Sequence, residues 1–269
     1  MQKWATGFLT PPFAAAFLFC ACFSSCAIQP TALSTLTVPG KTGTICDKER
    51  PGHSLPQGND DDGLTRAQRT ALLRPLYPST VEVWQHTFDK KGKSYIFSGS
   101  GAIIDDRGSV FTNHHVVEKT GEIYVAPRYL AWNGKVYTAF RKRVRMRIVA
   151  VSRTYDIAWL MPAETKSLPR PLSQARIRPF LYGERLWHLG KTSQWSFGRL
   201  SSFNPIRRRA RDIPDAIEMG AFGQRGDSGA PVVDASGMMA GVFFQTCYGL
   251  KEAYFIPLGL AKRAVGYVR

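Results

Sequence analysis

Residues 94–117, SYIFSGSGAIIDDRGSVFTNHHVV, contain two runs of β-branched, aromatic and small residues separated by the turn signal Asp106-Arg107-Gly108. Runs of this length bounded by glycine and aspartate are typical of β-strands joined by tight turns. Similar short runs continue on both sides, from Val81 to Pro162. Closely spaced strands with turn residues between them predict an all-β fold, either a barrel or a sandwich.

A second set of strand-like runs follows a connection rich in proline and arginine, residues 168–179. It includes residues 184–190 (ERLWHLG), 230–246 (APVVDASGMMAGVFFQT) and 252–257 (EAYFIP). Two β halves joined by a linker are therefore expected. The final stretch, residues 258–268 (LGLAKRAVGYV), has apolar side chains at helical spacing and predicts a short C-terminal helix.

The composition is that of a globular protein with a sizeable core. The chain has 269 residues, of which 44% are apolar and 21% charged, so disordered and collagen-like classes are excluded. The net charge is +16, and residues 76–269 carry 29 basic and 15 acidic residues, so the excess belongs to the folded part and favours anionic partners. The five cysteines form no C-x-x-C pair and no zinc-ligand spacing with histidine, so neither a metal nor a cofactor is expected.

The N-terminal residues 1–26 resemble an export signal. Lys3 is the only charge before residue 41, and residues 13–23 (FAAAFLFCACF) are all apolar. A membrane-spanning helix needs roughly 20 apolar residues, so this shorter run favours a secretory signal over a permanent span. We therefore expect the protein to be exported to the periplasm or cell envelope, with secretion from the cell as the alternative.

The cysteines raise two questions that the sequence leaves open. Residues 23–26 (FSSC) resemble a lipoprotein box, although Phe23 stands where leucine is usual, so lipidation of Cys26 and ordinary cleavage nearby are both compatible with the pattern. Removal of the leader would leave Cys46 and Cys247 as a pair. In an oxidising compartment they could form a disulfide, and two free thiols are the alternative.

Residues 27–75 predict a tether with a short helix at its end. The segment up to Gly63 is rich in threonine, serine, proline and glycine and shows no apolar periodicity. Its acidic residues 60–62 do not form a calcium loop, because Gly58 stands at the first ligand position and no glutamate closes the loop. Thr65 and Gln68 match a capping box that would begin the helix. Residues 76–269 are then the folded domain.

Three short motifs carry the residues of a nucleophilic site. Residues 226–231 (GDSGAP) place Ser228 in a tight glycine-flanked turn, whose successive N–H groups could bind an oxyanion, although an ordinary turn has the same composition. A serine hydroxyl is a weak nucleophile that needs an adjacent base oriented by a third group. Residues 112–117 (TNHHVV) supply histidines at a strand end, and Asp156 precedes an apolar run.

In this order the motifs resemble those of chymotrypsin-like (trypsin-type) serine proteases, nearest the bacterial HtrA-like branch without a PDZ domain. The resemblance covers about residues 78–268 and implies a double β-barrel. It also implies that Ser228 is the nucleophile, His115 the general base and Asp156 the carboxylate that orients the imidazole. The family pattern T-N-x-H-V-V selects His115 over its neighbour His114.

The resemblance further implies an oxyanion hole made by the backbone N–H groups of Gly226 and Ser228. The substrate pocket would be walled by four residues: Phe222, Phe243, Phe244 and Thr246. Because Phe222 stands where trypsin carries its acidic pocket residue, cleavage after lysine or arginine is disfavoured. The alternative for the two adjacent phenylalanines is that one or both rings turn into the barrel core, as alternating strand residues do.

Asp227 matches the trypsin-type pattern, whereas HtrA-like proteins usually have asparagine at this place. Trypsin-type enzymes use this aspartate to bind an N-terminus created by cleavage. No matching activation sequence precedes the first strand, so activation by cleavage is not expected.

Two basic segments suggest an anionic partner. Arg141, Arg143, Arg145 and Arg147 alternate with the apolar Val144, Met146 and Ile148, which predicts one basic and one core-facing side of a strand. Residues 207–211 hold four more arginines. A membrane surface or a polyanion would suit this charge, and a solvated basic face is the alternative. Specific nucleic-acid binding is not expected, because no aromatic residue alternates with the arginines.

The sequence thus predicts an exported serine endopeptidase that hydrolyses polypeptides through an acyl-enzyme. The alternative is a catalytically silent protease-like module that binds anionic surfaces through its basic face.

Overall fold

The computed structural model describes residues 62–131, 133–165, 167–174, 179–203, 206–207, 212–213, 215–247 and 252–268. For residues 206–207, 212 and 245–247 it describes the backbone only. Contacts divide the chain into residues 1–42 and 43–269, and all described residues belong to the second unit.

The first barrel uses the strands on both sides of the sequence quoted above. These strands are β1 (Thr80–Phe88), β2 (Ser94–Ile103), β3 (Val110–Thr112), β4 (Glu122–Leu130), β5 (Val136–Thr138), β6 (Val144–Ser152) and β7 (Ile157–Pro162). Because β1 pairs with both β2 and β4, six strands close in the order β1-β2-β3-β7-β6-β4, and β5 adds to the end of β4. Alternate residues such as Val81, Val83 and Leu160 fill its core.

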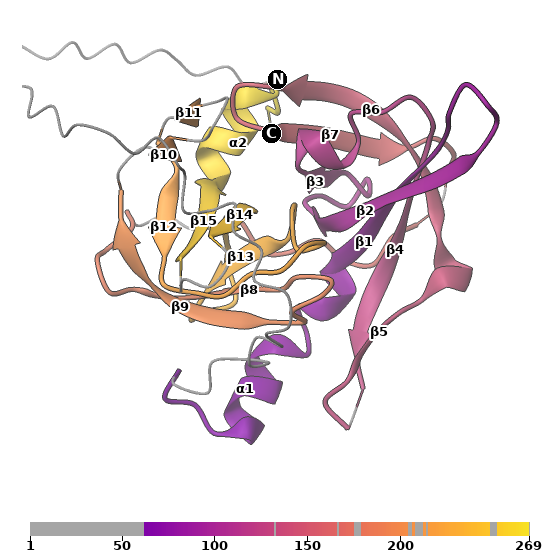
Figure 1. Ribbon diagram of the computed structural model, residues 1–269. Coiled ribbons are helices and arrows are strands. Elements are labelled where there is room, and N and C mark those ends of the chain that lie inside the picture. Colours follow the sequence, from indigo (N-terminus) through magenta and orange to yellow (C-terminus); the bar gives the residue numbers. More distant parts are fainter. Residues whose placement is uncertain are drawn as a thin grey trace, which may run out of the picture. The chain divides into compact units, whose positions relative to one another are not determined.

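The second barrel is closed in the order β12-β15-β14-β13-β8-β9. Its strands are β8 (Arg185–His188), β9 (Ser196–Ser202), β12 (Ile217–Met219), β13 (Pro231–Asp234), β14 (Met239–Cys247) and β15 (Glu252–Pro257). A small separate ladder joins β10 (Ile206–Arg207) and β11 (Asp212–Ile213), and the helix α2 (Leu258–Ala264) follows β15. Figure 1 shows the two barrels, β1–β7 in indigo to pink and β8–β15 in orange to yellow. The predicted double barrel and C-terminal helix are confirmed.

Two details of the predicted basic strand are wrong. Val144 and Met146 are buried and Arg145 and Arg147 exposed, as alternation requires, but Ile148 is 42% exposed instead of facing the core. Ile148 is the last residue of β6 before an irregularity in its pairing with β7, which shifts the register between Ile148 and Ala150. Arg141 and Arg143 lie before the strand, Arg141 in the 3₁₀ turn η4 (Phe140–Lys142) and Arg143 at its C-cap, so only Arg145 and Arg147 belong to the strand.

The short helix predicted from Thr65 and Gln68 is α1 (Arg66–Leu73), and both hydrogen bonds of the capping box are present. Leu73 is buried in a hydrophobic cluster that includes Trp187 and Met239 of the second barrel. The end of the predicted tether is therefore packed against the folded domain. No helix in the described part of the chain is long and apolar enough to cross a membrane.

Asp62 joins α1 to the second barrel. It is fully buried, and its carboxylate accepts hydrogen bonds from Arg69 Nε at 2.7 Å and from Trp187 Nε1 at 3.3 Å. Burial alone would raise the pKa of Asp62, but the bonds from Arg69 and the Leu64 N–H outweigh it and hold the pKa below its usual value.

We expect Asp62→Ala to lower the free energy of unfolding by about 3 kcal/mol, because it removes the buried carboxylate that pairs with Arg69. A depressed pKa stabilises the fold above the ordinary carboxyl pKa, and this stabilisation is lost as pH falls toward the folded-state value. The difference between wild type and variant should therefore shrink below about pH 4. Urea unfolding at pH 7 and pH 3 measures this difference, with Glu118→Gln at an exposed position as the control. An equal difference at both pH values would contradict the assignment.

Candidate active site

His115 and Asp156 form a close pair in the first barrel. His115 lies in the 3₁₀ turn η3 (His114–Val116) after β3, and Asp156 lies in the turn before β7. The His115 Nδ1 and Asp156 Oδ2 atoms are 2.6 Å apart. The imidazole is 39% exposed, whereas the carboxylate is 5% exposed. A buried carboxylate therefore holds a histidine whose other side reaches the surface.

The backbone fixes Asp156 against the histidine turn. Strands β3 and β7 are paired, so the ends that carry the two residues are adjacent. The carbonyl of Asp156 accepts hydrogen bonds from the His114 N–H at 3.0 Å and from Asn113 Nδ2 at 2.9 Å. Its Oδ1 accepts the His115 N–H at 2.9 Å, and its φ of +51° lies in the left-handed region that aspartate tolerates. Asn113 is thus a positioning residue that the sequence showed only as part of the family motif.

The hydrogen bond decides which nitrogen of His115 is basic. A carboxylate only accepts hydrogen bonds, so Nδ1 carries the proton and Nε2 has the free lone pair. His114 is 8% exposed, so its side chain is buried while that of His115 is partly open. The structure thus places the two histidines differently, and the choice of His115 as the base stays a prediction.

Ser228 lies in a turn that requires glycine on both sides. The φ angles of Gly226 and Gly229 are +96° and +88°. The Gly229 N–H donates to the Phe243 carbonyl at 2.8 Å, and a Cβ atom on Gly229 would lie 2.1 Å from the Ser100 carbonyl oxygen. The side chain of Ser228 is half-buried. Any other residue at 229 would push the turn away from β2.

Strand β2 brings the serine turn next to the histidine turn. The Ser228 carbonyl accepts the Ser100 N–H at 2.8 Å. A Cβ atom on Gly99 would lie 2.9 Å from the Ser228 carbonyl oxygen and 2.7 Å from Cγ2 of Val116, the residue after His115. The two turns therefore meet across Gly99, and the three residues predicted from separate motifs come from neighbouring segments.

The N–H groups of Gly226 and Ser228 are directed away from the protein's own acceptors. The carbonyl of Arg225 is held by Thr192 Oγ1 at 2.7 Å, and the carbonyl of Asp227 by the Ala230 N–H at 2.9 Å. In a trans peptide the N–H points opposite to the carbonyl. The Gly226 N–H therefore points away from Thr192, and the Ser228 N–H points away from Ala230. Within the described part of the chain neither N–H donates to any acceptor, as an oxyanion site requires.

Asp227, between these two groups, is held by backbone donors. It is fully buried, and its Oδ1 accepts the N–H groups of Thr192 at 2.9 Å and Ser193 at 3.1 Å. Its Oδ2 accepts the Gln224 N–H at 2.9 Å and lies 3.5 Å from His188 Nε2. Burial alone would raise the pKa of Asp227, but the hydrogen bonds from His188 and Ser193 lower it below its usual value.

The segment that holds Asp227 is itself anchored from the first barrel. Arg128, which is 2% exposed, donates from Nη1 to the Leu189 carbonyl at 3.0 Å and from Nη2 to the Lys191 carbonyl at 3.3 Å. His188 is fully buried, stacks on Phe243 at 4.5 Å and lies 3.1 Å from Ser193 Oγ. No sequence motif indicated Arg128 or His188, because both belong to strands with ordinary composition.

The predicted pocket residues are only partly found at a surface. Phe243 and Phe244 are each 1% exposed and point to opposite sides of β14, one into the second barrel and one into a cluster with residues of both barrels. The burial of both rings agrees with the alternative that one or both turn into the core. Phe222 is half-buried. The side chains of Thr246 and Cys247, and all of Cys46 and Cys26, lie outside the described residues.

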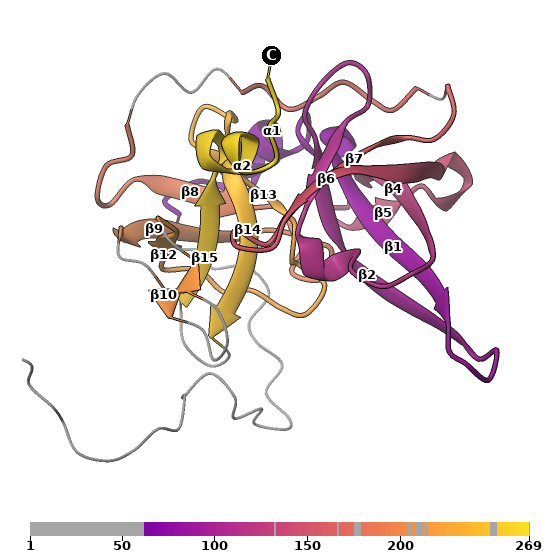
Figure 2. The same ribbon diagram turned by 90° about the horizontal axis from the view of Figure 1, so that it is seen from above.

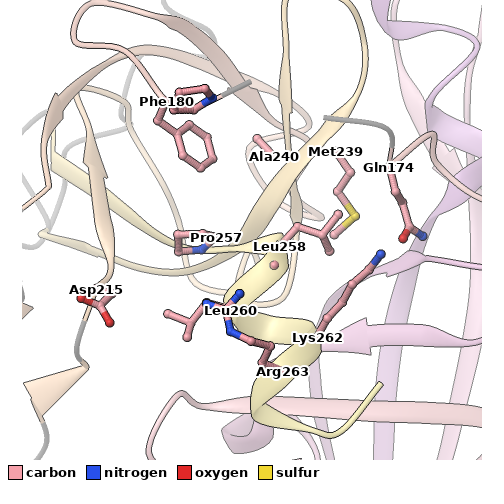
Figure 3. Close-up of a pocket in the computed structure, with 12 residues that line it drawn as sticks. Gln174, Phe180, Asp215, Met239, Ala240, Pro257, Leu258, Leu260, Lys262 and Arg263 are labelled. Atoms are coloured by element: carbon pink, nitrogen blue, oxygen red, sulfur yellow. The ribbon is translucent and has the colours of Figure 1, made fainter. Parts of the chain in front are cut away.

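A pocket of about 490 Å³ lies elsewhere, beside α2 (Figure 3). Leu258, Lys262 and Arg263 line it on one side, and Phe180 and Met239 on another. Neither the triad candidates nor the predicted pocket residues line it, so it is not the predicted substrate pocket. Among the described residues no group of three or more histidine, cysteine, aspartate or glutamate side chains could hold a metal ion.

Curated relatives of this chain are proteases. Serine endoprotease DegS from Escherichia coli is 26% identical over 197 residues, which cover 70% of this chain and 52% of the relative. The probable periplasmic serine endoprotease DegP-like from Chlamydia muridarum is 27% identical over 177 residues, 62% of this chain and 33% of the relative. Protease Do-like 1, chloroplastic, from Arabidopsis thaliana is 25% identical over 177 residues, 63% of this chain and 36% of the relative. The chain thus spans between a third and about half of their length.

A solved structure and a family model agree with the two barrels. The mutant, inactive form of Rv3671c from M. tuberculosis superposes with a TM-score of 0.54 at 20% identity, covering 73% of this chain and 90% of that one. At this identity the likeness supports the fold alone. The family model described as trypsin-like peptidase domain matches residues 99–242, more than half of the 269 residues. The chain therefore belongs to the family of trypsin-like peptidase domains.

Proposed function

We propose that this protein is a serine endopeptidase in which Ser228, His115 and Asp156 form the catalytic triad. The observation that carries the proposal is the His115–Asp156 pair at 2.6 Å beside a serine turn in which two backbone N–H groups donate to no acceptor of the described residues. Membership of the peptidase family supports the reaction class. The names of the relatives support a polypeptide substrate.

In the proposed reaction, Oγ of Ser228 attacks the carbonyl carbon of the scissile peptide bond, and its proton passes to Nε2 of His115. Asp156 holds the imidazole in the tautomer that can accept this proton and stabilises the imidazolium that forms. The carbonyl oxygen becomes an oxyanion, which the N–H groups of Gly226 and Ser228 bind. Each such donor typically lowers the barrier by about 3 kcal/mol.

Collapse of this intermediate breaks the C–N bond and expels the amine, which takes the proton from His115. The product acyl group remains on Ser228 as an ester. Water then attacks the ester with the same base and the same oxyanion site, which releases the acid and restores the serine. This sequence needs no cofactor.

We further propose that the oxyanion site is complete without proteolytic activation. In trypsin-type enzymes a new N-terminus binds the aspartate at the position of Asp227. Here Asp227 already has three backbone N–H donors and His188 around it, all from residues 188–193 and 224. An additional ammonium group is therefore not needed to keep the carboxylate ionised in its buried site.

The remaining predictions belong to the same proposal. Residues 1–26 act as an export signal, residues 27–75 as a tether whose end packs on the domain, and residues 76–269 as the protease domain. The protein would work in the periplasm or cell envelope, attached through Cys26 if that residue is lipidated. The half-buried Phe222 in place of an acidic residue favours cleavage after side chains other than lysine and arginine.

A fluorophosphonate probe tests the central assignment. We expect the exported protein to be labelled on Ser228, because only a serine activated by a base attacks the probe phosphorus. Ser228→Ala should abolish labelling and leave unfolding unchanged. The matched control is Ser201→Ala, since Ser201 is exposed on β9 and binds Glu218 at 2.7 Å. If the wild type remains unlabelled, the chain is the silent module that the sequence leaves as the alternative.

A further inference from the structure

The β1–β2 hairpin extends beyond the barrel to which it belongs. Pairing of β1 with β4 ends at His86, opposite Glu122, whereas pairing with β2 continues to Phe88, opposite Ser94. Residues 86–97, which we call the hairpin tip, are therefore a ribbon of two strands at their outer end. Both views show this tip projecting away from the other strands (Figures 1 and 2).

The hairpin tip exposes large apolar side chains on both of its faces. Phe88 and Ile96, on one face, are 62% and 67% exposed. Tyr95 and Phe97, on the other face, are 40% and 41% exposed. Isolated exposed apolar residues are common, but four neighbours on one ribbon form a patch that calls for a covering partner.

The turn of the same ribbon is basic. It contains Lys90, Lys91 and Lys93, which are all exposed. The only acid in the turn, Asp89, is used by the turn itself, where its carboxylate accepts the N–H groups of Lys91 at 2.8 Å and Lys93 at 2.9 Å. Three ammonium groups thus surround the end of an apolar ribbon.

We propose that the hairpin tip inserts into the interfacial region of an anionic lipid bilayer. A protein partner would cover one face of the ribbon, whereas the interfacial layer surrounds an inserted ribbon and covers both. Aromatic side chains such as Phe88 and Tyr95 are favoured at the level of the headgroups, and lysines bind anionic headgroups. The strands of the hairpin tip supply the apolar side chains and its turn supplies the lysines, so both features lie at one end of the ribbon.

A tryptophan placed on the tip reports directly on its environment. Phe88→Trp in the exported protein should show blue-shifted fluorescence, relative to the parent protein, when vesicles with about one third phosphatidylglycerol are added. Brominated lipids should quench this added emission. The matched control is Tyr137→Trp, because Tyr137 is 54% exposed on β5 and not on the hairpin. This measurement reports on the tip whatever else attaches the protein to the vesicle.

A second set of measurements tests the role of the lysines and distinguishes a membrane from other binding partners. Each lysine near an anionic surface contributes roughly fivefold to binding, so replacing Lys90, Lys91 and Lys93 with glutamine should weaken tip insertion by about 100-fold. Equal insertion into purely zwitterionic vesicles would contradict the charge argument. If bromolipids do not quench Phe88→Trp, or if the blue shift occurs without lipid in sedimenting dimers, the tip binds something other than a membrane and the proposal fails.

Discussion

Replacing His115 with alanine is expected to lower kcat by about 10⁶-fold, with a small effect on KM. The serine hydroxyl then has no base to accept its proton, and the leaving amine has no acid to protonate it. The residual rate should come from the two N–H donors at Gly226 and Ser228, which the substitution leaves in place. Initial rates on an unstructured polypeptide substrate, corrected for the fraction of folded enzyme, measure the loss.

The neighbouring histidine is the natural control for this substitution. His114→Gln changes the same residue type one position away, in the same 3₁₀ turn, but at a side chain that is 8% exposed. We expect this variant to lose some stability and to retain its kcat once folded. If His114→Gln loses as much kcat as His115→Ala, the assignment of the base is wrong, because a packing defect in the turn would explain both.

Asp227→Ala should reduce kcat/KM by about 10³-fold, mostly through kcat, because the oxyanion site acts on the transition state and not on bound substrate. Without the carboxylate, the N–H groups of Thr192, Ser193 and Gln224 lose their shared acceptor. The segment that carries the Gly226 N–H then loses its support. Asp227→Asn keeps one acceptor oxygen and should recover part of the activity.

A second buried aspartate, Asp234, provides the control that distinguishes a loss of catalysis from a loss of stability. Asp234 is 2% exposed, ends β13 and accepts the N–H groups of Ser236 at 2.9 Å and Met238 at 3.1 Å. Asp234→Ala should destabilise the second barrel to a similar degree without lowering kcat of the folded enzyme. Full kcat in folded Asp227→Ala, or activity that begins only when the N-terminus is cut, would overturn the proposed internal anchoring.

The sequence predicted the parts of the fold and site that depend on local patterns. Strand alternation and turn residues indicated the barrels. The capping residues Thr65 and Gln68 indicated the start of α1 to within one residue. The three site motifs indicated His115, Asp156 and Ser228 as the proposed triad, because each motif carries its residue in a distinctive neighbourhood. Asn113 was contained in one of these motifs, and its role became visible only with its bond to the Asp156 carbonyl.

The contacts that join distant segments could not be predicted in this way. His188 and Arg128 lie on ordinary strands and become important only because the two barrels place them beside Asp227 and its loop. Ile148 is exposed where the pairing of β6 with β7 becomes irregular, which no property of its own strand indicates. Phe243 and Phe244 could wall a pocket or fill a core, and only the packing of distant segments around them shows that both are buried.

The internal anchoring of Asp227 has a consequence for how such an enzyme is controlled. An oxyanion site that assembles with the fold leaves no latent precursor, so the onset of activity coincides with folding. Activity is then controlled by when and where the chain folds, and not by removal of a propeptide. Under the proposed function and the proposed export, the chain is harmless to the cell that makes it only while it is unfolded, and after folding its activity is limited by which polypeptides can reach it.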